Sequence, residues 1–175
     1  MGKNLYGALA YNQNKVDEGG AKILSAHLLR YPEDGRFRPD ESVRQFLEWM
    51  PNHYRTEKPV IHISLNPHPD DVLTDGQLAE IGREYMQRLG YGNQPYLVFK
   101  HEDIGRHHIH IVSLRVDSEG RKVSDKFEYR RSKEITELLE QKYGLHPAEG
   151  RKKGEERVDA SQIFLRQSAC RAISC

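Results

Sequence analysis

Residues 97–110 read Leu97-Val98-Phe99-Lys100-His101-Glu102-Asp103-Ile104-Gly105-Arg106-His107-His108-Ile109-His110. Strand-like segments at 96–102 and 107–116 flank the turn residues Ile104 and Gly105, a pattern that predicts a β-hairpin. Strands joined by so short a turn pair antiparallel, because a parallel pair needs a long crossover connection. The hairpin therefore favours an antiparallel sheet over a doubly wound parallel one.

The histidines of this hairpin form a predicted metal site. With the turn centred on Ile104-Gly105, His101 faces His108 on the neighbouring strand. His110 lies two residues beyond His108, so its side chain points to the same face. Three neutral imidazoles suit one divalent ion, and they suit Mn, Ni, Co or Zn better than Mg. Such an ion keeps open positions for substrate oxygens, which is typical of a catalytic metal.

Residues next to the three histidines refine this prediction. Asp103 is close enough in sequence to orient one imidazole through a hydrogen bond. Glu102 and His107 are expected on the opposite face, so no fourth ligand lies nearby and a structural metal is disfavoured. A His-x-His pair on a strand is common by chance. The third histidine, at the matching position across the hairpin, favours metal binding.

Segments outside the hairpin show both helical and extended patterns. Apolar residues recur at helical spacing in four of them: 21–29, 40–50, 75–89 and 132–144. The clearest helix begins with a capping-box pattern at Thr74 and Gln77 and ends at Gly90. Extended segments are expected at these positions: strands at 3–10 and 60–65, and a loop at 31–38. Together these elements predict an α+β fold, in which helices pack on a central antiparallel β-sheet and the hairpin carries the three-histidine site.

Composition limits the organisation of the chain. The 175 residues fit one domain with a real core, which we place at 1–146, followed by a polar tail or linker at 147–175, either truncated or disordered. No apolar run is long enough for a membrane span. The cysteines, Cys170 and Cys175, lie too close to the end of the chain to staple the fold, which favours a reducing cytoplasm. With a net charge of +1, any attraction to nucleic acid must come from a local patch.

The motifs resemble those of a known family. His101-x-Asp103 followed by His108-x-His110 is similar to the three-histidine motif of Mob-type relaxases, which belong to the superfamily of endonucleases with a histidine–hydrophobe–histidine motif. Residues 6–12, Tyr-Gly-Ala-Leu-Ala-Tyr-Asn, resemble the segment that carries the nucleophilic tyrosine there. Residues 59–67 and 115–117 also fit the family. The resemblance is closest to relaxases of mobilizable elements of anaerobic gut bacteria.

The resemblance implies a function for these residues. A relaxase nicks one strand of origin-of-transfer DNA for plasmid or mobile-element mobilization, with a metal ion that assists transesterification by a tyrosine. It implies Tyr11 as the nucleophile, with Tyr6 and then Tyr31 as the next choices, and a 5′-phosphotyrosine adduct. It further implies single-stranded DNA, an accessory DNA-binding mobilization protein and a coupling protein as partners.

Basic side chains after the hairpin are candidates for DNA contact: Lys122, Lys126, Arg130 and Arg131. The aromatic residues Phe127 and Tyr129 are interleaved with them, and such rings can stack on single-stranded bases. The acidic neighbours Asp125 and Glu128 leave an ordinary solvated surface equally open.

Two other functions stay open at this point. One is a rolling-circle replication initiator or transposase of the same superfamily, in which the tyrosine commonly follows the histidine motif, as Tyr129 and Tyr143 do here. The other is a histidine-rich metal or nucleic-acid-binding module that is not an enzyme, which predicts metal-dependent folding without strand cleavage.

Overall fold

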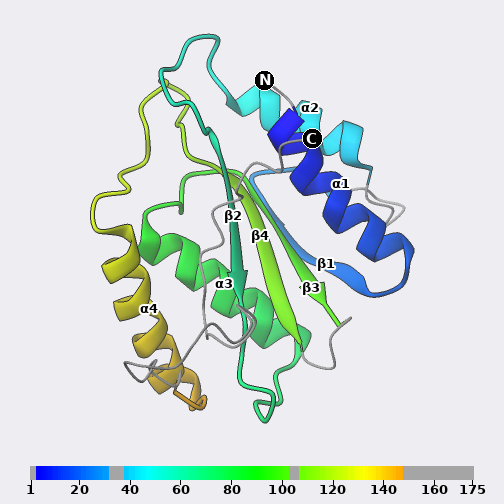
Figure 1. The fold of residues 1–175 in the computed structure, drawn as a ribbon, viewed down its shortest axis with the longest axis vertical. Helices are drawn as coiled ribbons and strands as arrows, with labels where there is room; N and C mark the ends of the chain where they lie inside the picture. The colour runs from blue at the N-terminus through cyan, green and yellow to red at the C-terminus, as the bar shows by residue number, and fades with distance from the viewer. Residues whose placement is uncertain (1–2, 32–37, 103–106, 148–175) are drawn as a thin grey trace, which may run out of the picture.

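The computed structural model describes residues 3–31, 38–102 and 107–147. Its elements follow one another in this order: α1 (Lys3–Asp17), β1 (Ala21–His27), α2 (Pro39–Trp49), β2 (Val60–Leu65), α3 (Asp75–Leu89), β3 (Tyr96–His101), β4 (His108–Leu114) and α4 (Glu128–Tyr143). The four strands form one sheet in the order β1-β3-β4-β2, and each neighbouring pair is antiparallel (Figure 1). The predicted α+β fold with a central antiparallel sheet is confirmed.

The histidine hairpin occupies the middle of this sheet. β3 and β4 pair with each other, and β1 and β2 lie outside them. The register places His101 opposite His108, as the sequence predicts, and His110 opposite Phe99. The two strands are slightly shorter than expected, since β3 ends at His101 and β4 runs over His108–Leu114. Because β3 and β4 are each paired with a strand on both edges, the sheet fixes the spacing of all three histidines.

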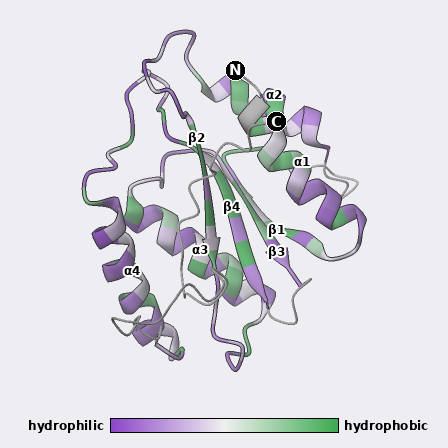
Figure 2. Ribbon diagram, viewed as in Figure 1, coloured by the Kyte–Doolittle hydropathy of each residue, from purple (hydrophilic) through white to green (hydrophobic). Residues whose placement is uncertain are grey.

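Alternating side chains divide the sheet into two faces. One face carries Leu97, Phe99 and Val112, which pack against Leu5 and Leu9 of α1 together with residues of α2. The opposite face packs against α3, to which α4 adds Ile135 and Leu139. Figure 1 shows α1 and α2 on one side of the sheet and α3 and α4 on the other. In Figure 2, β4 is largely hydrophobic, but its end toward the hairpin turn is hydrophilic.

Two predicted elements at the N-terminal end are wrong. Residues 3–10, expected as a strand, belong to helix α1, and residues 21–29, expected as a helix, contain strand β1. The apolar stripe of α1 joins Leu5, Ala8 and Leu9 to Val16, so its helical period becomes visible only over the full length of the helix. β1 is an edge strand whose conformation depends on pairing with β3, a distant segment.

Most other elements agree with the sequence prediction. β2 has the predicted bounds, and so does α3, whose capping box joins Thr74 to Gln77 before Gly90 ends the helix with φ 101°. The last helix begins earlier than expected, at Glu128, after Phe127 adopts a left-handed conformation with φ 54°. The predicted loop at 31–38 falls mostly outside the described residues. Within the described part of the chain, every helix is too short or too polar to cross a bilayer.

Candidate metal centre and nucleophile

The three predicted histidine ligands converge on one face of the hairpin. The ring centroids of His101 lie 5.2 Å from those of His108 and 4.2 Å from those of His110, and the His108 and His110 centroids are 5.0 Å apart. Each histidine offers one ring nitrogen, and the three nitrogens lie within 4.8 Å of one another. His101 and His108 are buried, and His110 is partly buried. The antiparallel register brings them together, because it sets His101 beside His108 and the strand repeat adds His110.

The surroundings favour neutral imidazoles. Burial lowers the pKa of His110 to about 2, and the neighbouring His62, His101 and His108 add to this shift. Burial also lowers the pKa of His62 to about 4. A metal binds the neutral form of imidazole, so a proton competes weakly for His110 at neutral pH. The donor set of three imidazoles fits a divalent transition ion that keeps open positions.

Two further side chains hold these histidines, and the sequence prediction missed both. His62 of β2 lies beside His110, with its Nε2 2.7 Å from Nδ1 of His110. Asn12 of α1 lies beside His101, with its Oδ1 2.8 Å from the His101 Nε2. Both contacts join segments that are far apart in the chain, so no local sequence pattern predicts them. Asp103, the partner predicted from the sequence, lies outside the described residues.

Tyr11 projects from α1 over the histidine cluster. Its ring stacks on His101 with 6.0 Å between centroids and 24° between planes, and it meets His110 edge-on at 6.2 Å. The side chain is 47% exposed, so solvent and substrate can reach it. Tyr6 and Tyr31 are exposed to a similar extent. Position, rather than exposure, distinguishes Tyr11. The strand predicted at 3–10 would have ended just before Tyr11, but Tyr11 lies within helix α1.

A large groove lies beside the first residues of β2 and includes His62, the neighbour of His110. Its volume is about 1260 Å³, and its lining includes Ala8 of α1 and His62. The loop before β2 contributes both ring-bearing and cationic side chains to the lining: His53, Tyr54, Arg55 and Lys58. The segment after β4 contributes Arg115 and Lys122. Basic and aromatic groups thus line a groove that includes His62, which contacts the candidate metal ligand His110.

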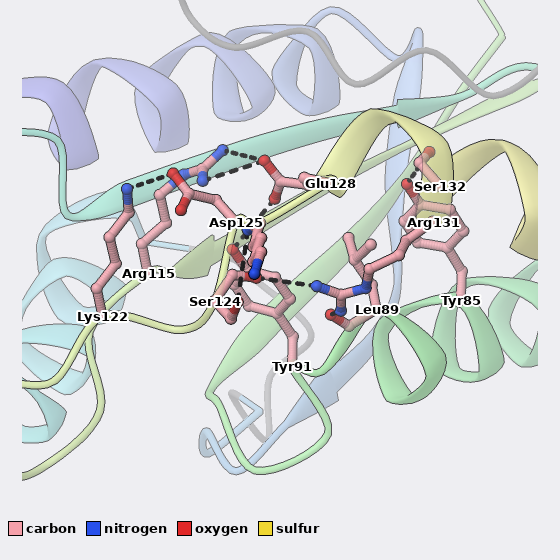
Figure 3. A network of polar contacts seen from close by, with 11 residues as sticks. Tyr85, Leu89, Tyr91, Arg115, Lys122, Ser124, Asp125, Glu128, Arg131 and Ser132 are labelled. Carbon is pink, nitrogen blue, oxygen red and sulfur yellow. Dashed lines mark hydrogen bonds and ion pairs between the residues drawn. The ribbon is translucent and has the colours of Figure 1, made fainter.

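The basic side chains predicted to contact DNA have different surroundings. Lys122 lines the groove and pairs with Asp125. Arg131 donates to the carbonyl oxygens of Ser124 and Leu89, which ties α4 to the end of α3 (Figure 3). Arg130 pairs with Glu134 along α4 at 2.9 Å, and the Lys126 ammonium lies 5.5 Å from the Phe127 ring centroid. Lys122 is therefore the member of this set that lies on the groove, whereas Arg131 joins structural elements.

A second group of metal-type ligands lies at the far end of β2. His68, Asp70 and His146 each offer one ligand atom, and these atoms lie within 4.8 Å of one another. His146 already bonds the Asp71 carboxylate through Nδ1 at 2.6 Å, a contact that raises its pKa. Asp70 and His146 are exposed. The ion pair with Asp71 accounts for the position of His146, so the hairpin histidines are the stronger candidate for a metal centre.

Comparison with known proteins gives one match. The family described as the nuclease domain of MobA/VirD2-like relaxases matches residues 11–145. The matched region includes Tyr11, Asn12, His62 and the three hairpin histidines. Searches of curated proteins and of solved structures found no match.

Proposed function

The chain belongs to the family of MobA/VirD2-like relaxase nuclease domains, and from this premise we propose that it is a metal-dependent relaxase that nicks DNA through Tyr11. The observation that carries the proposal is the position of the Tyr11 ring, 6.0 Å from that of His101 and 6.2 Å from that of His110. A nucleophile and three metal-type ligands on one face of the sheet are the components that phosphodiester transesterification requires.

Tyr11 performs the covalent step. Its phenolic oxygen attacks the phosphorus of the scissile phosphodiester, an O–P bond forms, and the bond to the 3′ oxygen breaks. The products are a 5′-phosphotyrosine and a strand with a 3′-hydroxyl, which takes up a proton, while the phenol proton is lost to solvent at the exposed ring. The number of phosphoester bonds does not change, so attack by a 3′-hydroxyl reverses the step and rejoins a strand.

A divalent ion held by the three imidazoles would supply Lewis-acid polarisation of the phosphate, which an ordinary phenol with a pKa of about 10 needs at neutral pH. The protein side chains do the rest. His101, His108 and His110 are the proposed ligands, and the buried sheet holds them in place. Helix α1 holds Tyr11 on a regular element, which limits its motion relative to the histidines.

The groove beside His62 is the proposed path of the single-stranded DNA. Arg55, Lys58 and Lys122 line it and can pair with phosphates, and Tyr54 can stack on a base. Glu57 and Asp125 share the lining, so the attraction is local and moderate. This balance agrees with the net charge of +1, and we expect sequence specificity to come from individual contacts with the DNA rather than from a general electrostatic field.

The wider setting follows from the relaxases that this chain resembles. We propose origin-of-transfer DNA of a mobilizable element as the substrate, in the cytoplasm. An accessory DNA-binding mobilization protein opens or marks the duplex, and a coupling protein receives the strand.

The superfamily alternative finds little support from the tyrosines after the histidine motif. Tyr143 packs on the face of the sheet opposite the histidines, and its hydroxyl donates to Glu84 at 3.3 Å. Tyr129 is 84% exposed and lies on α4. This helix packs its residues Ile135 and Leu139 into the hydrophobic core on the side of the sheet opposite the histidines. A rolling-circle initiator or transposase mechanism that uses either tyrosine would need its hydroxyl on the histidine face.

The test is formation of a covalent adduct. The chain is incubated with single-stranded oligonucleotides tiled across the origin-of-transfer region of its element, with and without Mn²⁺, and resolved on a denaturing gel. A DNA–protein band that needs the metal and is lost with EDTA supports a relaxase. DNA binding without an adduct at any tile and with any divalent ion would instead identify a non-enzymatic binding module.

A further inference from the structure

Asn12 lies where packing would favour an apolar side chain. The buried side of α1 includes Leu5, Ala8 and Leu9, and Asn12 follows on the same stripe with 0% of its surface exposed. A buried amide destabilises the fold unless its polar atoms are hydrogen-bonded. The partners of Asn12 therefore define its role.

Those partners fix the orientation of the amide. Its Nδ2 donates to the carbonyl oxygen of Ala8 at 2.7 Å, so Oδ1 is the atom that faces Nε2 of His101 at 2.8 Å. An amide oxygen can only accept, which means that Nε2 of His101 carries the proton and donates. A neutral imidazole with its proton on Nε2 has its lone pair on Nδ1.

We infer that Asn12 is a positioning residue that holds His101 in the tautomer with a proton on Nε2, leaves Nδ1 for the metal, and so ties the helix of Tyr11 to the metal centre. The inference rests on the metal-binding role proposed above. Partners that fix the tautomer of a metal-binding histidine are usually carboxylates, carbonyl groups or water. Here the partner is a side-chain amide from another element, 89 residues away in the sequence.

The link has a second consequence for α1. Asn12 directly follows Tyr11, so the bond to His101 fixes the rotation of the helix at the residue next to the proposed nucleophile. The His101 ring thus meets α1 twice, through its Nε2 to Asn12 and through its stacked face to Tyr11. Any change that reorients this imidazole acts on both contacts.

Metal affinity of purified variants tests the inference without any need for DNA. Asn12→Leu removes the amide and continues the apolar stripe, whereas Asn12→Asp keeps an oxygen acceptor for His101. Asn14→Leu, at an exposed position of the same helix, is the matched control. Dissociation constants for Co²⁺, Ni²⁺ and Mn²⁺ are measured by competition with a chromophoric chelator. The Co²⁺ absorption spectrum reports the ligand geometry, and thermal unfolding without metal reports folding.

We expect Asn12→Leu to bind metal about 10- to 100-fold more weakly, with an altered Co²⁺ spectrum. Asn12→Asp and Asn14→Leu should stay within a few-fold of the wild type. Unchanged affinity in a folded Asn12→Leu protein would make Asn12 a packing residue and overturn the inference. A selective gain of Mn²⁺ affinity in Asn12→Asp would make residue 12 a direct ligand, which also overturns it.

A measurement on the wild-type chain covers the case in which Asn12→Leu does not fold. Nitrogen-15 NMR of the metal-free protein distinguishes the two histidine tautomers. We expect the His101 proton on Nε2, and a proton on Nδ1 would contradict the inference. A wild-type chain that shows the expected tautomer but binds no divalent ion would overturn the metal assignment, and the inference with it, whereas metal binding with the other tautomer would overturn the inference alone.

Discussion

The ring of Tyr11 stacks on the ring of His101, with 6.0 Å between centroids and 24° between planes. The two residues come from α1 and β3, which are separated in the sequence by β1, α2, β2 and α3. Tertiary packing alone creates this contact. It places an exposed phenol beside a buried imidazole, and the first prediction follows from that pairing.

Replacement of Tyr11 by Phe should abolish the covalent DNA adduct. The change removes one oxygen from a ring that is 47% exposed, so folding, metal affinity and DNA affinity should persist. Tyr6→Phe, at another exposed position of α1, is the control and should retain the adduct. The measurement is a denaturing gel together with a thermal melt. Full adduct formation by Tyr11→Phe would move the nucleophile to another tyrosine.

Replacement of His62 by Leu should weaken metal binding by about 10- to 100-fold, although His62 is not one of the three proposed ligands. Its Nε2 lies 2.7 Å from Nδ1 of His110, so the contact directs the other nitrogen of His110 toward the ligand cluster. His53→Leu is the control, because His53 lines the same groove at an exposed position. Calorimetric titration with Ni²⁺ measures both variants, and equal affinities would reduce His62 to a packing role.

Lys122 and Arg131, two basic residues of the same predicted set, should behave differently on substitution. Lys122→Gln should weaken single-stranded DNA binding and reduce the slope of log affinity against log salt by roughly 0.7, the value for one phosphate contact. Fluorescence anisotropy at several salt concentrations measures the slope. Arg83→Gln, an exposed cation of α3 paired with Glu80, should leave the slope unchanged. An unchanged slope in Lys122→Gln would remove this residue from the DNA path.

Arg131→Gln should instead lower stability. Its guanidinium donates to the carbonyl oxygens of Leu89 and Ser124, and both lose a charged partner on substitution (Figure 3). We expect a loss of about 1–3 kcal/mol in the free energy of unfolding, measured by urea denaturation. The folded variant should bind DNA normally. A normal unfolding curve with weakened DNA binding would reverse this assignment.

Acid sensitivity should depend on Glu84, which joins α3 to α4. Its carboxylate accepts hydrogen bonds from Lys142 at 2.7 Å and from Arg88 at 2.8 Å, and these contacts, that of Lys142 first, hold its pKa below the ordinary value. The stabilisation is therefore present above the ordinary carboxyl pKa of about 4.3 and is lost as pH falls through the lowered value.

Glu84→Gln should accordingly destabilise the fold at neutral pH by about 1–3 kcal/mol, and the difference from the wild type should shrink in acid. Denaturant unfolding at a series of pH values measures it. Glu80→Gln breaks an exposed pair with Arg83 and should have little effect at any pH. A Glu84 variant whose deficit does not depend on pH would show that shape, rather than charge, matters at this position.

The sequence predicts the hairpin and its histidines well because their arrangement is local. One turn position sets the register of His101 and His108, and the strand repeat adds His110. Asn12 and His62 escape prediction because their partners lie 89 and 48 residues away. The sequence predicts a strand where α1 lies and a helix where β1 lies, and both errors have a similar cause. The helix pattern of α1 needs its whole length, and β1 takes its conformation from β3.

The candidate site combines three parts of the chain: Tyr11 and Asn12 of α1, His62 of β2, and the hairpin histidines His101, His108 and His110. A ribosome makes the tyrosine first and the histidines long afterwards. A nascent chain that stops before β3 therefore carries the proposed nucleophile without the proposed ligands, and a fragment that starts after α1 carries the ligands without the nucleophile. Neither piece holds the whole proposed site. If the proposed assignment holds, the site is complete only when synthesis has delivered β4 and β4 has paired with β3, and we expect incomplete products of translation to leave the DNA around them uncut.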